Sequence, residues 1–160
     1  MMIHELLNNI LPFRLLGIGC AILCGFIIGL ERQLSGKPAG IRTSILICMG
    51  TYAFIVLSTI IETKTFDGSR VLGQVITGIG FLGAGLIFNK DGLVNGVTSA
   101  AVIWVMAGIG SLIGFEKYGA AITLTIMTVM VLTIIGVAEH KFRKLRQGVH
   151  EENESNDNDD

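Results

Sequence analysis

Five long apolar stretches, none with a charged residue near its centre, dominate this chain of 160 residues. They cover roughly Ile10–Leu30, Thr43–Ile61, Val71–Phe88, Val97–Phe115 and Tyr118–Val137. A helix of about 18–21 residues is about 27–32 Å long, which matches the hydrocarbon core of a bilayer. Because backbone groups within lipid must be hydrogen-bonded internally, each stretch is expected to be a helix. The predicted fold class is therefore all-α, a polytopic membrane bundle of five transmembrane helices.

The composition excludes several other classes of protein. Hydrophobic residues make up 51% of the chain and charged residues only 16%, against about 25% charged residues in soluble domains. This is too apolar for a disordered chain, and it is more apolar surface than a soluble domain of this size buries. The 21 glycines have no three-residue period and are accompanied by only 2 prolines, which excludes collagen. The glycines therefore belong within the membrane helices.

The basic residues are distributed unequally between the two sides of the predicted membrane. Four lie on one side, namely Arg14, Lys64, Arg70 and Lys117. Eight lie on the other side, namely Arg32, Lys37, Arg42, Lys90, Lys141, Arg143, Lys144 and Arg146. The positive-inside rule places the larger set in the cytoplasm, with the N-terminus outside and the C-terminus inside. We expect residues 1–140 to form the transmembrane domain. Residues 141–160 are expected to be a basic juxtamembrane stub that contacts membrane lipid, followed by a disordered acidic tail.

Small residues recur on particular helix faces, and this pattern predicts where helices pack closely. In the third stretch, the predicted packing face combines Gly73, Thr77, Gly80 and Ala84 with Gln74, Gly78, Phe81 and Gly85. Its opposite face, Val75, Ile79, Leu82 and Leu86, is predicted to meet lipid. The packing set as a whole is Gly25, Gly29, Gly73, Gly78, Gly80, Gly83, Gly85, Ala100 and Gly108. The alternative is that Gly78–Gly85 line a path or break the helix.

The other stretches show related patterns. In the first, Gly17, Ala21, Cys24, Ile28 and Glu31 lie on one face, which predicts that Glu31 ends a buried stripe. In the fourth, the face of Ala100, Trp104, Ala107, Ser111 and Gly114 is predicted to pack, and that of Val102, Met106, Ile109 and Ile113 to meet lipid. The fifth stretch has glycines only near its ends and is expected to be peripheral. The cysteines are expected to be free and buried.

Two loops on the predicted cytoplasmic side carry most of the polar residues. They supply Glu31, Arg32 and Arg42 from the first loop, and Asn89, Asp91, Asn95 and Thr98 from the second. These residues form either helix caps and interfacial ion pairs, or a polar binding site at the cytoplasmic mouth. Glu31 needs a partner on a packing face, and Arg42 is the expected one. On the other side, Asp67 is expected to cap the third helix or to pair with Arg70.

No catalytic or metal-binding motif occurs in the sequence. It contains no phosphate-binding loop, no GxSxG, no HExxH and no Cys/His cluster. The glycines of Gly78-Ile-Gly-Phe-Leu-Gly follow no strand, so they do not predict a nucleotide site. We therefore expect neither enzymatic activity nor a cofactor, a metal site or nucleic-acid binding.

Two segments resemble the signature blocks of the MgtC/SapB family of bacterial membrane proteins. They are GLERQLSGKPAGIRTSILICMG (residues 29–50) and DGSRVLGQVITGIGFLGAGLIFNKDGLVNGVTSAAVIWVMAGIGSL (residues 67–112). The resemblance covers roughly Gly17 to Val137, without the soluble C-terminal domain that many relatives carry. It implies a multi-pass inner-membrane protein linked to magnesium limitation, acid or phosphate stress and virulence. It also marks Glu31, Arg32, Arg42, Asp67, Arg70, Gln74, Asn95 and Thr98 as functional positions.

Two functions follow as hypotheses. The first is a regulatory protein that modulates another membrane machine, such as the F-type ATP synthase or a cation transporter, by binding it through small-residue helix faces. The second is a transporter or channel for magnesium or another small ion, with Gln74, Thr77, Thr98 and Ser99 lining a path. A homo-oligomer is expected in either case, because Gly25-x-x-x-Gly29 leaves a face for a second copy.

Overall fold

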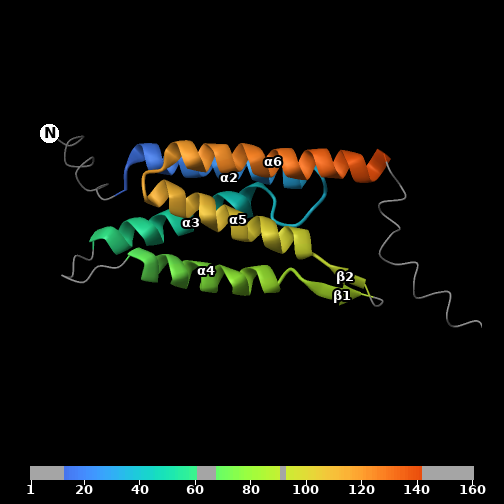
Figure 1. The fold of residues 1–160 in the computed structure, drawn as a ribbon, viewed down its shortest axis with the longest axis horizontal. Coiled ribbons are helices and arrows are strands. Elements are labelled where there is room, and N and C mark those ends of the chain that lie inside the picture. The colour runs from blue at the N-terminus through green and yellow to red at the C-terminus, as the bar shows by residue number, and fades with distance from the viewer. Residues whose placement is uncertain (1–12, 61–67, 91–92, 142–160) are drawn as a thin grey trace, which may run out of the picture.

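The computed structural model describes residues 13–60, 68–90 and 93–141 of the chain. Within these ranges, five helices run alternately up and down an elongated bundle (Figure 1). They are α2 (Leu15–Leu34), α3 (Ile41–Ile60), α4 (Gly68–Ala84), α5 (Val97–Gly114) and α6 (Tyr118–Lys141). The five predicted helices are therefore present. The predicted Asp67 and Asp91 sites and the tail beyond residue 141 lie outside the described residues.

Four of the helices are long and apolar enough to cross a membrane. These candidate spans are Leu15–Leu34, Ile41–Thr59, Val97–Gly114 and Tyr118–Ala138. The remaining helix, α4, has 17 residues, which is the lower limit for crossing a bilayer. It begins and ends earlier than the predicted stretch, because the chain leaves the helix at Gly85 and enters a strand at Phe88.

A short antiparallel hairpin connects α4 to α5, where the sequence analysis expected only a loop. Strand β1 (Phe88–Lys90) pairs with β2 (Leu93–Asn95), with Phe88 opposite Asn95. An Asp-Gly dipeptide between two strands is a common hairpin signal, and residues 91–92 carry it in the sequence. Figure 1 shows the hairpin extending beyond one end of the bundle, here called the hairpin end. At this end α2, α4 and α6 finish, and α3 and α5 begin.

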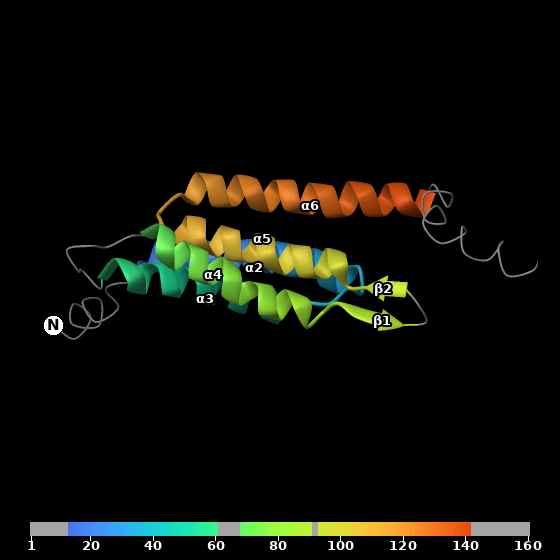
Figure 2. The same ribbon diagram turned by 60° about the horizontal axis from the view of Figure 1, so that its bottom comes forward.

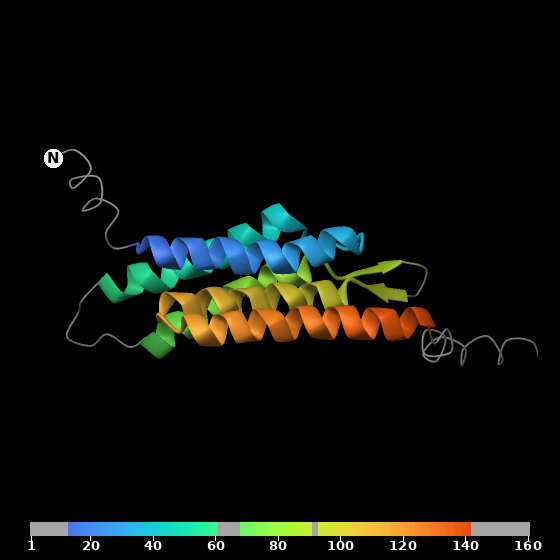
Figure 3. The ribbon, with the colours of Figure 1, turned by 90° about the horizontal axis from the view of Figure 1, so that it is seen from above.

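Helix α5 lies at the centre of the bundle, and α6 lies at its edge. Among the described helices, α5 contacts α2, α3, α4 and α6. Figure 2 shows α6 on one outer side of the bundle, and Figure 3 shows it alongside α5. Only 11% of the α6 span is buried, against 56% of the α5 span. The peripheral position expected for the helix of the fifth stretch, Tyr118–Val137, is therefore confirmed for α6.

Glycines bring α2 and α3 into backbone contact. A Cβ added at Gly25 would lie 2.7 Å from the Cα of Ile45, and one added at Gly29 would lie 2.6 Å from the Cα of Ile41. The first-helix stripe of Gly17, Ala21, Cys24 and Ile28 is buried as predicted. The Gly25-x-x-x-Gly29 face is not left for a second copy, because α3 of the same chain covers it.

The packing face of α4 differs from the one predicted, although Leu82 is exposed as expected. Val75 and Ile79, expected to meet lipid, are half-buried, whereas Gly73, Gln74, Thr77, Gly78, Gly80, Phe81, Ala84 and Gly85 are exposed. Gly83 is the exception on this helix, since a Cβ there would lie 3.6 Å from Ala100 of α5. The large side chains fill the space against α3 and α5, so the small residues face outward. Of the packing set, Gly73, Gly78 and Gly80 have no atom within 4 Å of an added Cβ, and neither does the half-buried Gly108 of α5.

The predicted lipid face of α5 is also wrong. Val102, Met106, Ile109 and Ile113 are buried, while Trp104, expected to pack, is 54% exposed. Both faces of α5 are covered, because this helix has neighbours on several sides. Its small residues pack as well: a Cβ at Gly110 would meet the carbonyl oxygen of Cys48 at 2.5 Å. The cysteines Cys20, Cys24 and Cys48 are buried and free, as expected.

At the end of the bundle opposite the hairpin, Glu116 adopts a strained backbone conformation. Its φ of 60° follows the end of α5, where the N–H of Lys117 bonds the carbonyl of Leu112 at 2.8 Å. This position of a helix C-terminus is normally filled by glycine. Glu116 accepts a 2.7 Å ion-pair hydrogen bond from Arg14, which precedes α2. Arg14 therefore lies just before α2, although the predicted first stretch, Ile10–Leu30, included it.

Replacing Glu116 with glycine tests whether the ion pair with Arg14 offsets the backbone strain at Glu116. In an Arg14→Ala background, Glu116→Gly is expected to raise the free energy of unfolding by about 1 kcal/mol, because glycine adopts positive φ without strain. In the wild-type background the gain is expected to be smaller, since an exposed ion pair worth up to about 1 kcal/mol is lost. Unfolding in mixed detergent micelles measures both. Equal gains in the two backgrounds would show that the ion pair contributes nothing.

Candidate functional site

A buried arginine joins α2 to α5 at the hairpin end. Arg32, in the last turn of α2, is 3% exposed, and its Nη2 donates a 2.9 Å hydrogen bond to Oγ of Ser99. Ser99 is the third residue of α5 and is also buried, at 3% exposure. A cationic side chain this deeply buried is rare without a pairing or functional role. We take Arg32 and its neighbours Glu31, Ser35 and Ser99, here called the Arg32 cluster, as the candidate site.

Glu31 supplies the nearest negative charge within the Arg32 cluster. One carboxylate oxygen, Oε1, accepts a 2.8 Å hydrogen bond from Ser35, while Oε2 lies 3.8 Å from Nη1 of Arg32. The side chain of Glu31 is 13% exposed. Its partner is therefore Arg32 and not Arg42, which is exposed at the start of α3. The reason is geometric, because the first turn of α3 packs against Gly29 and directs Arg42 outward.

The cluster contains two buried polar atoms that make no hydrogen bond within the described residues. Among the described residues, Oε2 of Glu31 and Nε of Arg32 are buried and make no hydrogen bond. The 3.8 Å separation between Glu31 and Arg32 is too long for a hydrogen bond. Both atoms therefore have capacity for a further donor or acceptor. The arrangement can hold a small polar group, whereas a nucleophile with an adjacent base is not among the described residues of the cluster.

The remaining predicted site residues do not join the cluster. Asn89, Asn95 and Thr98 are exposed, and Nδ2 of Asn95 donates to the carbonyl of Leu93 within the hairpin. None of Asn95, Thr98 or Ser99 is the N-cap of α5, which is Gly96 with a φ of 89°. Arg70 is exposed at the start of α4, at the opposite end of the bundle. The structure thus brings together Glu31 and Arg32, together with Ser99, which the sequence suggested only as a cap or path residue.

One feature of the sequence indicates that Arg32 is buried, but none identifies Ser99 as its partner. Arg32 lies four residues after Ile28 and seven after Gly25, and both of these are buried. It therefore continues the stripe that packs against other helices. Its acceptor lies 67 residues further along the chain, and nothing in the sequence near Arg32 identifies it.

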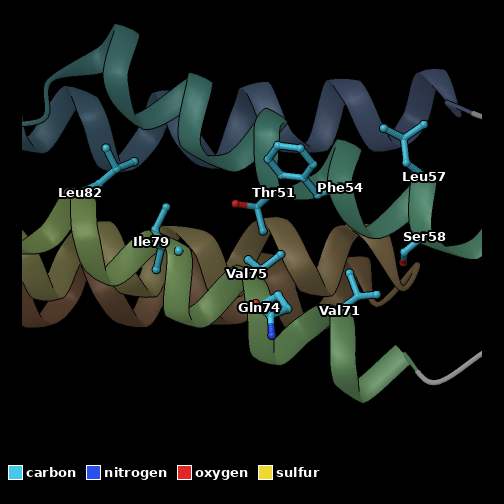
Figure 4. A pocket seen from close by; sticks show the side chains of 10 residues that line it. Thr51, Phe54, Leu57, Ser58, Val71, Gln74, Val75, Ile79 and Leu82 are labelled. Carbon is cyan, nitrogen blue, oxygen red and sulfur yellow. The ribbon is translucent and has the colours of Figure 1, made fainter.

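A second feature is an apolar cavity of about 540 Å³ between α3 and α4. Figure 4 shows Thr51 and Phe54 of α3 on one side of it and Val75 and Ile79 of α4 on the other. Gln74 contributes the polar group of α4 to its wall. The cavity does not reach the Arg32 cluster, and Thr77 is exposed and bonded to the carbonyl of Gly73. Among the described residues, this cavity therefore includes Gln74 but does not connect it to Thr98, Ser99 or Glu31.

The surface chemistry defines the class of protein. Large apolar side chains are exposed along the helices, for example Leu46 at 68%, Phe54 at 63% and Ile134 at 60%. Helix hydroxyls bond their own backbone, as Ser111 does to the carbonyl of Ala107 at 2.9 Å. With four candidate spans, this is a multi-pass helical membrane protein. Within the described ranges, no group of three or more His, Cys, Asp and Glu side chains is placed to hold a metal ion.

Residues 18–141 match the MgtC family model. The chain is 40% identical over 137 residues to the "Putative magnesium transporter YhiD" of Escherichia coli (strain K12), covering 81% of this chain and 62% of that protein. The chain belongs to the MgtC family.

Two further relatives carry the family name. "Protein MgtC" of Brucella abortus (strain 2308) is 37% identical over 130 residues, covering 80% of this chain and 54% of the relative. "Protein MgtC" of Salmonella typhimurium (strain 14028s / SGSC 2262) is 35% identical over 131 residues, covering 82% and 56%. The chain thus spans a little over half the length of these relatives. No solved structure matches it.

Proposed function

We propose that this chain is a regulatory protein of the bacterial inner membrane that acts in magnesium homeostasis by binding another membrane protein. The observation that carries the proposal is the exposed face of α4, where a Cβ added at Gly73, Gly78 or Gly80 would have no atom of the described residues within 4 Å. Lipid-exposed glycines of this kind allow close approach of a partner helix. The link to magnesium rests on the name of the Escherichia coli relative and on the family resemblance.

The proposed partners are the F-type ATP synthase or a cation transporter. The resemblance supplies these candidates, together with the link to acid or phosphate stress and virulence. We further propose that the hairpin end faces the cytoplasm and the Arg14 end faces outward. A reporter fused after residue 160 is expected to be active only inside the cell, and activity outside would contradict this orientation.

A substitution at Gly80 tests the proposed partner face. Gly80→Leu is expected to leave the fold intact and to reduce photocrosslinking of α4 to the partner at least tenfold, because the side chain prevents close helix approach. Crosslinked ATP synthase and cation transporters are identified by mass spectrometry, and ATP-driven proton pumping is measured in inverted membrane vesicles. The matched control is Ile126→Leu on α6, where the residue is 53% exposed.

The expected result is inhibition of pumping or transport by the wild type and the control, but not by Gly80→Leu. A crosslinked product of twice the chain mass would identify a second copy as the occupant and would remove the argument for a different partner. Unchanged partner activity with all three proteins would contradict the regulatory proposal.

Transport by the chain itself is the alternative function. The cavity between α3 and α4, with Gln74, Thr51 and Ser58 in its wall, is the observation in its favour. In proteoliposomes that contain only this protein, the proposed regulator is expected to show no magnesium flux. Flux that is lost in Gln74→Leu and Glu31→Gln would establish the alternative.

A further inference from the structure

One cationic donor in the core of the hairpin end has no acceptor. Nε of Arg32 is buried, and among the described residues it makes no hydrogen bond. A buried donor on a charged group that stays unsatisfied costs about 1–3 kcal/mol or more. The neighbouring Glu31 does not relieve it, because its carboxylate approaches Nη1 instead, at 3.8 Å. An acceptor from outside the described chain is therefore favoured at Nε.

The free donor points toward the start of α5. In a planar guanidinium, Nε–H and one N–H of Nη2 lie on the same edge, and Nη2 of Arg32 donates to Ser99 of α5 at 2.9 Å. This edge is the one that binds two oxygens of a carboxylate or phosphate in parallel. Nη1, which lies in the same plane but is not part of this edge, is the guanidinium group nearest Glu31. The two-donor edge therefore lies beside the first turn of α5 and does not include the nitrogen nearest the carboxylate.

The first turn of α5 has donors of its own. The helix begins after Gly96, which has no side chain to cap it, and its first backbone bond runs from the N–H of Ala100 to the carbonyl of Gly96 at 2.9 Å. The N–H groups of Val97, Thr98 and Ser99 therefore have no partner within the helix. Val97 and Thr98 are exposed, so this turn is open from outside. A helix N-terminus with open N–H groups favours an anion.

We propose that the Nε–Nη2 edge of Arg32 and the N–H groups of Val97–Ser99 form a binding site for a phosphate-class oxyanion. The full charge of Arg32 and the partial charge of the helix N-terminus exceed the charge of the single Glu31 carboxylate, which leaves a small positive excess. A tetrahedral phosphate offers separate oxygens to the guanidinium and to the helix N–H groups. The phosphate has two possible sources, a lipid headgroup at the membrane surface or free phosphate.

Binding is tested on the full-length chain, purified and delipidated in dodecyl maltoside. One arm adds sodium phosphate against sodium chloride at equal ionic strength. The other adds phosphatidylglycerol against monogalactosyl diacylglycerol, which has no phosphate. The readout is the rise in Tm with ligand concentration, which gives the affinity. A response to phosphate identifies the free anion as a ligand, and a response to phosphatidylglycerol alone identifies the headgroup.

The variants separate the proposed site from general surface charge. Arg32→Lys keeps the charge but loses the two-donor edge, and is expected to weaken binding about tenfold. Arg42→Lys is the matched control at the same end of the bundle, exposed and expected to bind as the wild type does. Val97→Pro removes one N–H at the first helical position and is expected to weaken binding about fivefold.

Weakening in Arg32→Lys and Val97→Pro, with Arg42→Lys unchanged, would support the site. If Arg32→Lys does not fold, the affinities of Val97→Pro and Arg42→Lys are compared instead, and weaker binding by Val97→Pro alone supports the site. A wild type that responds to neither probe would overturn the proposal. Equal responses in all variants would overturn it as well, since diffuse charge would then account for binding.

Discussion

Gly25→Leu is expected to lower the free energy of unfolding by about 3 kcal/mol, the upper part of the range for overpacked cores. The added Cβ would lie 2.7 Å from the Cα of Ile45 and 2.8 Å from the carbonyl oxygen of Ser44. Both are backbone atoms, so no rotamer change relieves the overlap and the two helices must separate. α2 and α3 form the most extensive helix contact of the described chain. Thermal unfolding in detergent is expected to shift down by about 6–12 °C.

The matched control is Gly80→Leu, the same chemical change on α4. A Cβ at Gly80 meets nothing within 4 Å, so the expected change in stability is within about 0.5 kcal/mol. The pair separates the cost of close packing from the general effect of replacing a helical glycine. Equal destabilisation by the two substitutions would show that α2 and α3 do not pack as closely as the structure places them.

Arg32→Met is expected to destabilise the protein by about 3–5 kcal/mol, the cost of breaking a buried charge pair by removing one partner. The substitution leaves the Glu31 carboxylate, 13% exposed, without a cation, and Oγ of Ser99 without its donor. Adding Glu31→Gln to this variant is expected to recover a large part of the loss, because the remaining side chain is neutral. The free energies of unfolding of the single and double variants in detergent give the coupling energy between Glu31 and Arg32.

The control for this series is Arg42→Met, which removes an exposed arginine at the same end of the bundle. Its expected effect is within about 0.5 kcal/mol. Additive losses from Glu31→Gln and Arg32→Met would contradict the pairing, because residues that interact directly give non-additive effects. A large loss in Arg42→Met would indicate that Arg42 has a structural role in place of Arg32.

The faces of α4 and α5 show where prediction from sequence failed. Small residues were expected to mark the covered face of each helix, yet on α4 the half-buried side chains are Val75 and Ile79, and on α5 both faces are covered. In water, an apolar face identifies the side that packs. In lipid both the neighbouring helix and the solvent are apolar, so residue size alone does not show which face is covered.

The Arg32 cluster was predicted only in part. Glu31 and Arg32 were identified from their position at the end of an apolar stretch, but Arg42 was expected to be the partner of Glu31. The observed partners are adjacent residues, and the second anchor of Arg32 is Ser99, 67 residues away. Sequence position indicates that a charge at a helix end needs a partner. Which partner it meets depends on how α2 and α5 lie against each other.

The sequence by itself determined the solvent, the five helices and the family, because length, hydropathy and a specific motif are local properties of the chain. It also placed Gly25 and Gly29 on a packing face, but the structure decided that α3 of the same chain, and not a second copy, occupies that face. Only the tertiary structure decided that α5 is central, that the glycines of α4 face outward and that Arg32 bonds Ser99. These features depend on distances between helices far apart in sequence, and many helix arrangements satisfy the same apolar pattern.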